Sequence, residues 1–184
     1  MAVIVLSCKK NDNTVKSFYN LDSLIKAQVI YLAEKKPVLF KEALMDHKSD
    51  TAFLKNLDTT AWYKELEVFR QLDLNRKTFN MESYSTVQGM QDPYSNLLIC
   101  EYKAKDKLAI RNVKIYYDGN LNNPKKIEGE YYDHNGLYAN ARNMVMELNT
   151  VRSTAVLTRY TITGGQKMIL GDTVEFKITG TVIH

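Results

Sequence analysis

The densest group of residues that could do chemistry is the segment 128–134, which reads Glu-Gly-Glu-Tyr-Tyr-Asp-His. If this segment is a β-strand, Glu128, Glu130 and Tyr132 share one face, because side chains two residues apart point the same way. A pair of neighbouring carboxylates can perform acid–base catalysis or hold calcium. The alternative interpretation, which the sequence favours, is a solvated strand face on which the two charges repel at modest cost.

The remaining chemical motifs give no catalytic assignment. His47 and His134 lie in turn-like segments, His184 is the final residue, and none has zinc-ligand spacing to another His or to Cys. The sequence contains no phosphate-binding glycine loop, no dinucleotide-binding glycine motif and no Gly-x-Ser-x-Gly elbow. We therefore expect no metal and no cofactor, and we assign no catalytic residue.

A second candidate site is apolar. One parity of an expected strand over residues 137–148 carries Tyr138, Met144, Met146 and Leu148. Because methionine adapts its shape and often lines apolar pockets, we take Tyr138, Met144 and Met146 as candidate ligand-binding residues for a lipid or another apolar small molecule. The alternative interpretation is ordinary core packing without a ligand.

The composition is that of a globular protein with a sizeable core. The chain has 184 residues, which fits one domain, with 45% hydrophobic and 25% charged residues. Its 25 basic and 21 acidic residues are mixed along the chain, so the net charge of +4 forms no basic strip and we expect no nucleic-acid partner. Cys100 lies in the apolar run 97–100, and we expect it to be a small buried side chain rather than half of a disulfide with Cys8.

The first eight residues resemble the end of a bacterial lipoprotein signal. A short apolar run, residues 2–6, is followed by Ser7 and Cys8, and then by the polar segment 9–14. In this interpretation cleavage follows Ser7 and Cys8 carries the lipid. The segment lacks the basic start and the apolar stretch of about 7–15 residues of a complete signal peptide, so we expect it to be truncated. The alternative is a short first β-strand that ends in an ordinary cysteine.

A first helix is expected to begin near Asp22 or Ser23, either of which can cap it, and to stop before Pro37. Its apolar stripe would consist of Leu24, Ile25, Val29, Leu32 and Ala33, opposite the polar residues Lys26, Gln28 and Glu34. Residues 38–45 and 51–54 then predict two strands joined by a turn. A helix over residues 41–54 is the competing prediction.

A second helix is expected to follow a cap at Asp58, Thr59 or Thr60. Helical spacing then aligns four large apolar side chains, Trp62, Leu66, Phe69 and Leu72. We expect this helix to cover a sheet and to bury Trp62 against it.

The rest of the chain alternates between apolar runs and turn residues, which predicts a series of short-linked antiparallel strands. The predicted strands are residues 78–89, 95–104, 108–117, 125–132, 137–148, 153–163, 166–170 and 173–183. The pair Gly164-Gly165 predicts a hairpin turn, because both residues tolerate a positive φ. The apolar parity slips within residues 108–117, so we expect a β-bulge at Arg111-Asn112.

The last strand shows the clearest alternation. We expect Val174, Phe176, Ile178 and Val182 to point into the core, and Glu175, Lys177 and Thr179 to point into water. Gly180 falls on the inward parity, which predicts a sharp bend or the close approach of a helix.

Several short segments resemble a group of uncharacterised envelope lipoproteins common in Bacteroidetes. They are residues 62–69 (Trp-Tyr-Lys-Glu-Leu-Glu-Val-Phe), residues 72–76 (Leu-Asp-Leu-Asn-Arg), residues 160–169 (Tyr-Thr-Ile-Thr-Gly-Gly-Gln-Lys-Met-Ile) and the start Ser7-Cys8-Lys9-Lys10. The resemblance implies a location in the envelope and carries no activity or functional residues with it.

These observations predict one α+β domain, with two N-terminal helices packed on a long, curved antiparallel meander. Residues 1–20 would be the truncated signal and a flexible tether, and residues 21–184 the domain. The expected function is non-enzymatic: a lipid-anchored protein of the bacterial envelope, on its periplasmic or surface face, that binds an apolar small molecule or a protein partner. The alternatives are an enzyme that acts on an envelope substrate and a structural subunit of an envelope complex.

Overall fold

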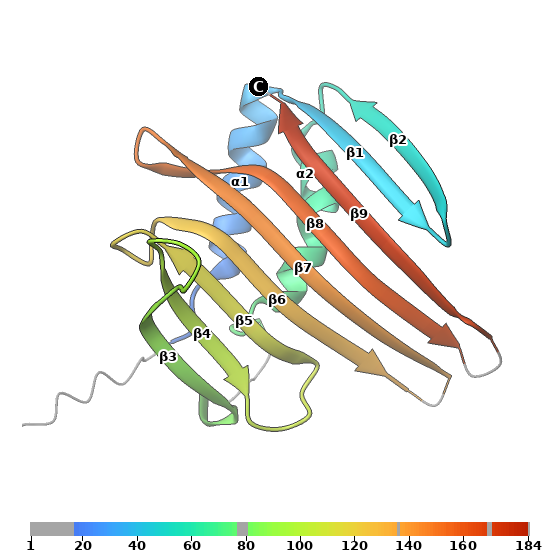
Figure 1. The fold of residues 1–184 in the computed structure, drawn as a ribbon. Coiled ribbons are helices and arrows are strands. Elements are labelled where there is room, and N and C mark those ends of the chain that lie inside the picture. The colour runs from blue at the N-terminus through green and yellow to red at the C-terminus, as the bar shows by residue number, and fades with distance from the viewer. Residues whose placement is uncertain (1–16, 77–80, 136, 169–170, 184) are drawn as a thin grey trace, which may run out of the picture.

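Two helices pack on one face of a twisted, curved, nine-stranded antiparallel sheet (Figure 1). The computed structural model describes residues 17–76, 81–135, 137–168 and 171–183. This architecture confirms the predicted α+β class. One face of the sheet carries the helices, and we call the opposite face the open face.

The elements follow the chain in a simple order. They are α1 (Leu21–Lys35), β1 (Val38–Met45), β2 (Lys48–Leu54), α2 (Thr59–Leu66) with its 3-10 continuation η1 (Glu67–Leu72), a short 3-10 turn η2 (Met81–Ser83), β3 (Tyr84–Gln91), β4 (Leu98–Ala104), β5 (Ile110–Tyr117), β6 (Pro124–His134), β7 (Tyr138–Val151), β8 (Thr154–Met168) and β9 (Thr173–Ile183). Strands β3 to β9 form the predicted meander. The β1–β2 hairpin, not the competing helix over residues 41–54, extends the sheet beyond β9.

Local side-chain hydrogen bonds define where both helices begin. The Asn20 side chain accepts from the Ser23 backbone N–H at 2.9 Å, so α1 begins slightly earlier than predicted. The Asp58 side chain caps α2 by accepting from the Ala61 N–H at 2.7 Å, as predicted. α1 ends at Lys35, and its C-cap Lys36 adopts a left-handed conformation immediately before Pro37.

Gln28 is buried at 1% exposure, so the prediction that it faces solvent is wrong. Its side-chain amide donates to the Ala155 carbonyl at 2.8 Å and accepts from the Leu157 N–H at 2.7 Å. β9 pairs with β8 only from Arg159 onward, so this earlier part of β8 has no β9 neighbour. The Gln28 amide therefore replaces a neighbouring strand as the hydrogen-bond partner of the Ala155 carbonyl and the Leu157 N–H, so these buried backbone groups are satisfied.

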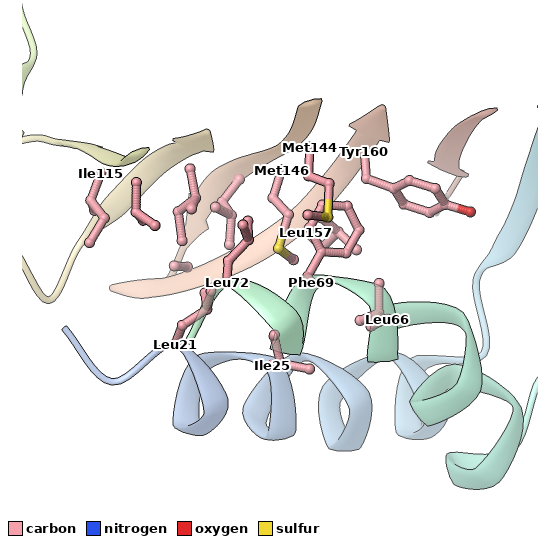
Figure 2. Packing of buried hydrophobic residues seen from close by; sticks show 14 of the residues in the cluster. Leu21, Ile25, Leu66, Phe69, Leu72, Ile115, Met144, Met146, Leu157 and Tyr160 are labelled. Atoms are coloured by element: carbon pink, nitrogen blue, oxygen red, sulfur yellow. The ribbon is translucent and has the colours of Figure 1, made fainter. Parts of the chain in front are cut away.

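The second helix covers the sheet as predicted. Trp62, Leu66, Phe69 and Leu72 are all buried in one hydrophobic cluster. Figure 2 shows Leu66, Phe69 and Leu72 lying between α1 and the sheet side chains. Leu72 fits over Gly129, where an added Cβ would come within 2.3 Å of the leucine Cδ1.

Several strand predictions need correction. The strand predicted over residues 78–89 begins only at Tyr84, after the 3-10 turn η2. β8 runs without interruption from Thr154 to Met168, so Gly164-Gly165 is not a hairpin turn. Gly164 instead allows a close approach of two groups: an added Cβ would lie 2.4 Å from the Ala141 carbonyl oxygen and 2.7 Å from Cζ of Phe176. Thr179 is 4% exposed and so is not a water-facing residue. The bulge at Arg111-Asn112 is confirmed, because the β5–β6 register shifts between Ile110 and Asn112.

The packed chain begins a few residues before the predicted boundary at residue 21. Phe18 is buried and makes edge-to-face contacts with Tyr84 and Tyr102, with ring centroids 5.5 and 5.4 Å apart. The Tyr19 N–H donates to the Tyr102 hydroxyl at 3.1 Å. These contacts fix the point at which the N-terminal segment meets the sheet.

Gly180 leaves space for a tyrosine from the neighbouring strand, not for a helix. An added Cβ would lie 2.2 Å from Cζ of Tyr160. The Tyr160 hydroxyl donates to the Glu65 carboxylate, and its ring packs edge-on against Phe69 at 5.7 Å. The Glu65 carboxylate also pairs with Lys41 at 2.8 Å, so the tyrosine is held from several sides.

We predict that Gly180→Ala lowers the free energy of unfolding by about 1–3 kcal/mol, because the methyl group displaces the held Tyr160 ring. Gly171→Ala is the matched control, since its Cβ would meet only Met168 Cβ at 3.7 Å. Denaturant midpoints measure both effects. In a Tyr160→Ala background the cost of Gly180→Ala should largely disappear, and an unchanged cost there would contradict the steric explanation.

Candidate functional site

The proposed apolar ligand residues do not come together around a cavity. Met144 and Met146 are 0% exposed and pack into the core beneath the helices (Figure 2). Tyr138 lies half-buried at the start of β7, where its hydroxyl donates to Asp133 at 3.0 Å. A small pocket between Leu21, Leu72 and Ile115, which neither methionine lines, has a volume of about 10 Å³ and so has room for at most one water molecule.

The other candidate residues are also dispersed. Cys8 and His184 lie outside the described residues. Cys100 is a fully buried free cysteine, as predicted, and burial raises the pKa of its thiol. His47 belongs to the β1–β2 turn, beside an open depression of about 530 Å³ on the sheet, and His134 ends β6.

Glu128 is the centre of a polar cluster on the open face. The Tyr116 hydroxyl donates to its carboxylate at 2.6 Å, and Lys126 pairs with it at 2.8 Å. Burial raises the pKa of Glu128, but the hydrogen bonds from Lys126 and Tyr116 outweigh burial and the net pKa shift is downward. A carboxylate of this kind stays ionised and already has partners, which does not favour a role as a general acid.

The surrounding groups complete a network of ion pairs. The Asn112 side chain donates to Glu101 at 3.0 Å, and Lys114 lies 3.6 Å from the same carboxylate oxygen. Glu130 is exposed. Among the described residues, no group of three or more His, Cys, Asp or Glu side chains could hold a metal ion. The carboxylates of Glu101 and Glu128 thus already have cationic and hydrogen-bonding partners on this strand face.

The two edges of the sheet differ in whether the strand is interrupted. β3, at one edge, is interrupted by a bulge at Gly89, which has φ +80° and no partner in the β3–β4 register. Bulges of this kind protect an edge from pairing with another chain. β2 lies at the opposite edge (Figure 1) and pairs with β1 without a shift from Leu54 to Lys48. Its residues are exposed over nearly the whole strand.

The turn geometry determines which backbone groups of β2 face outward. Asp46 and His47 have φ values of 45° and 67°, as in a two-residue type I′ hairpin turn. The alternation of an antiparallel ladder then directs the N–H and C=O groups of Ser49, Thr51 and Phe53 away from β1. The Thr51 N–H agrees with this, because it donates to the Asp50 carboxylate at 2.8 Å and not to β1.

Apolar side chains flank this edge on the open face. Phe53 is 63% exposed, and its ring lies 4.7 Å from that of Phe40 on β1. Ile183 of β9 is 46% exposed and has the same parity as Thr181, the register partner of Phe40. We call Phe40, Phe53 and Ile183 the hairpin patch. The sequence did not reveal this site, because nothing in residues 48–54 shows that they form an edge.

A scan against protein-family models and searches of curated proteins and of solved structures found no match. Within the described ranges, no helix is both long and apolar enough to cross a membrane. The function therefore has to be inferred from the residues themselves.

We predict that Glu128→Gln destabilises the protein at pH 7 and that this difference from the wild type shrinks as the pH falls. The pKa of Glu128 is lowered from its usual value of 4.5, so its stabilising contribution is present above that value and is lost as the pH falls through the lower, folded-state pKa. Urea midpoints at pH 7 and at about pH 3 test this. Glu130→Gln, at an exposed position of the same strand, is the control. A Glu128→Gln difference that is constant with pH would contradict the prediction.

Proposed function

We propose that this chain is a non-enzymatic lipoprotein of the bacterial envelope that binds a protein partner by adding the partner's strand to β2. The observation that carries the proposal is the open edge of β2, whose outward backbone groups and flanking hairpin patch have no covering element in the described part of the chain. Natural sheets usually protect such an edge with a bulge, a proline or a covering helix. An edge left open is a template for strand addition.

A protein partner fits the structure better than an apolar small molecule. The methionines that could have lined an apolar pocket are fully buried among core side chains. The open edge offers main-chain hydrogen bonds from Ser49, Thr51 and Phe53, and the hairpin patch offers apolar contact on one face. The partner segment is therefore an extended strand whose alternate side chains suit an apolar surface.

The N-terminal residues support attachment to a membrane. Ser7-Cys8 followed by a polar segment resembles a lipoprotein processing site, with Cys8 as the acylated residue. Phe18 is packed against the sheet, ten residues after Cys8. A fully extended chain of that length reaches at most about 33–36 Å, so an acylated Cys8 would keep the domain close to the membrane surface.

The edge is tested with a photo-cross-linking residue at Ser49, expressed in the envelope of a host bacterium. We expect a cross-linked protein product that disappears when Thr51→Pro is added. Proline removes an outward N–H but no hydrogen bond to β1, so the hairpin itself should survive. The same cross-linker at Val87, an exposed position of the bulged β3 edge, is the control. Equal products from both positions, or a product insensitive to Thr51→Pro, would refute strand addition.

The anchor is tested by metabolic labelling with a fatty-acid analogue, using the chain preceded by a complete signal peptide. We expect label on the wild-type protein, and none on Cys8→Ser, which should move from the membrane to the soluble fraction. Cys100→Ser is the control, since the buried Cys100 thiol is not a lipidation candidate. Label that persists in Cys8→Ser would exclude this residue as the anchor.

A further inference from the structure

The open edge of β2 is complementary to itself. When two identical strands pair antiparallel about a two-fold axis, outward residues must face outward residues. A two-fold axis at Thr51 places Thr51 opposite Thr51 of the second copy, and Ser49 opposite Phe53 of the second copy. All three outward positions of each strand are then used, and each opposed pair exchanges two hydrogen bonds.

Side-chain chemistry favours this register over its neighbours. On the open face, a threonine meets a threonine and the exposed Phe53 ring covers a small serine, both favourable cross-strand pairs. On the other face, Asp50 meets Ala52 and Lys48 meets Leu54, so no like charges are opposed.

Alternative registers are worse for identifiable reasons. Shifting the pairing register by two residues toward the turn moves the two-fold axis from Thr51 to Asp50. Asp50 then lies directly opposite Asp50 of the second copy, which opposes two like charges. A shift of two residues the other way places Ser49 opposite Lys55, beyond the end of β2, so one opposed pair is lost. Shifting the register by one residue would place residues whose N–H and C=O groups point away from β1 opposite residues whose groups point toward β1, so the two strands could not hydrogen-bond.

We propose that two copies of this chain pair through their β2 strands about a two-fold axis at Thr51, joining two nine-stranded sheets into one continuous sheet. This inference rests on the proposed function, because it names the partner of the same edge. The Asp50 carboxylate regulates the contact. In the single chain it holds the Thr51 N–H at 2.8 Å, and it must release that N–H before the second copy's carbonyl can accept it.

Disulfide formation tests the register in a Cys8→Ser background, in which Cys100 is buried. Thr51→Cys should give a disulfide-linked dimer on mild oxidation, because directly opposed Cα atoms lie about 5.5 Å apart, within disulfide range. Ser49→Cys alone should not, since the two Ser49 positions are separated by four residues along the strand, about 13 Å. The double variant Ser49→Cys with Phe53→Cys should restore the cross-link. Equal dimer from the two single variants, or none from Thr51→Cys, would overturn the register.

Sedimentation equilibrium of the unlinked protein tests the role of Asp50. Asp50→Ala should lower the dimer dissociation constant several-fold, and Thr51→Pro should abolish the dimer. Adjacent substitutions would thus act in opposite directions, which a general loss of stability cannot produce. If the protein stays monomeric while Ser49 still cross-links a different protein in a way that Thr51→Pro abolishes, the second copy is not the partner but the proposed strand addition stands. If the protein stays monomeric and the cross-linker at Ser49 gives no product that Thr51→Pro abolishes, both the pairing of two copies and the strand addition to β2 are refuted.

Discussion

The contact between Tyr160 and Gly180 is the one on which the arrangement of the sheet, the second helix and the hairpin depends. The ring of Tyr160 occupies the space that a side chain at Gly180 would fill, so β8 and β9 can pair closely beneath it. Its hydroxyl reaches Glu65 on α2, and Glu65 pairs with Lys41 on β1. Burial, together with the hydrogen bond to Glu65, raises the pKa of the Tyr160 hydroxyl well above its usual range, so it remains a hydrogen-bond donor.

Three of the places in the described sheet where backbone groups lack a neighbouring strand are treated differently. At the free end of β8, Gln28 supplies the missing partner from α1. At β3, the bulge at Gly89 interrupts the edge. At β2, the Asp50 carboxylate holds a single N–H and the rest of the edge is open. A carboxylate can be displaced by a competing carbonyl, whereas a bulge cannot, so β2 is the edge suited to reversible pairing.

The open face and the helix-covered face divide the chemistry of the molecule. The covered face is filled with apolar side chains, including the two methionines. On the open face, Glu101 pairs with Lys114 at 3.6 Å and Glu128 pairs with Lys126 at 2.8 Å. The edge of β2, in contrast, presents outward backbone groups that no described element pairs with. The proposed binding role rests on this edge.

The sequence by itself determined much of the local structure: the period-two strands, a capped start of the second helix at residues 58–60, the buried face of that helix and the bulge at Arg111-Asn112. These depend on side-chain periodicity and on hydrogen bonds between residues a few positions apart. Only the tertiary structure decided that β1 pairs with β9, that Gln28 is buried, that Gly164 lies within a strand and that β2 is an edge. The physical reason is that hydrogen bonds between strands join residues distant in sequence, and a strand's own pattern does not show which neighbour it will have or whether it will have one at all.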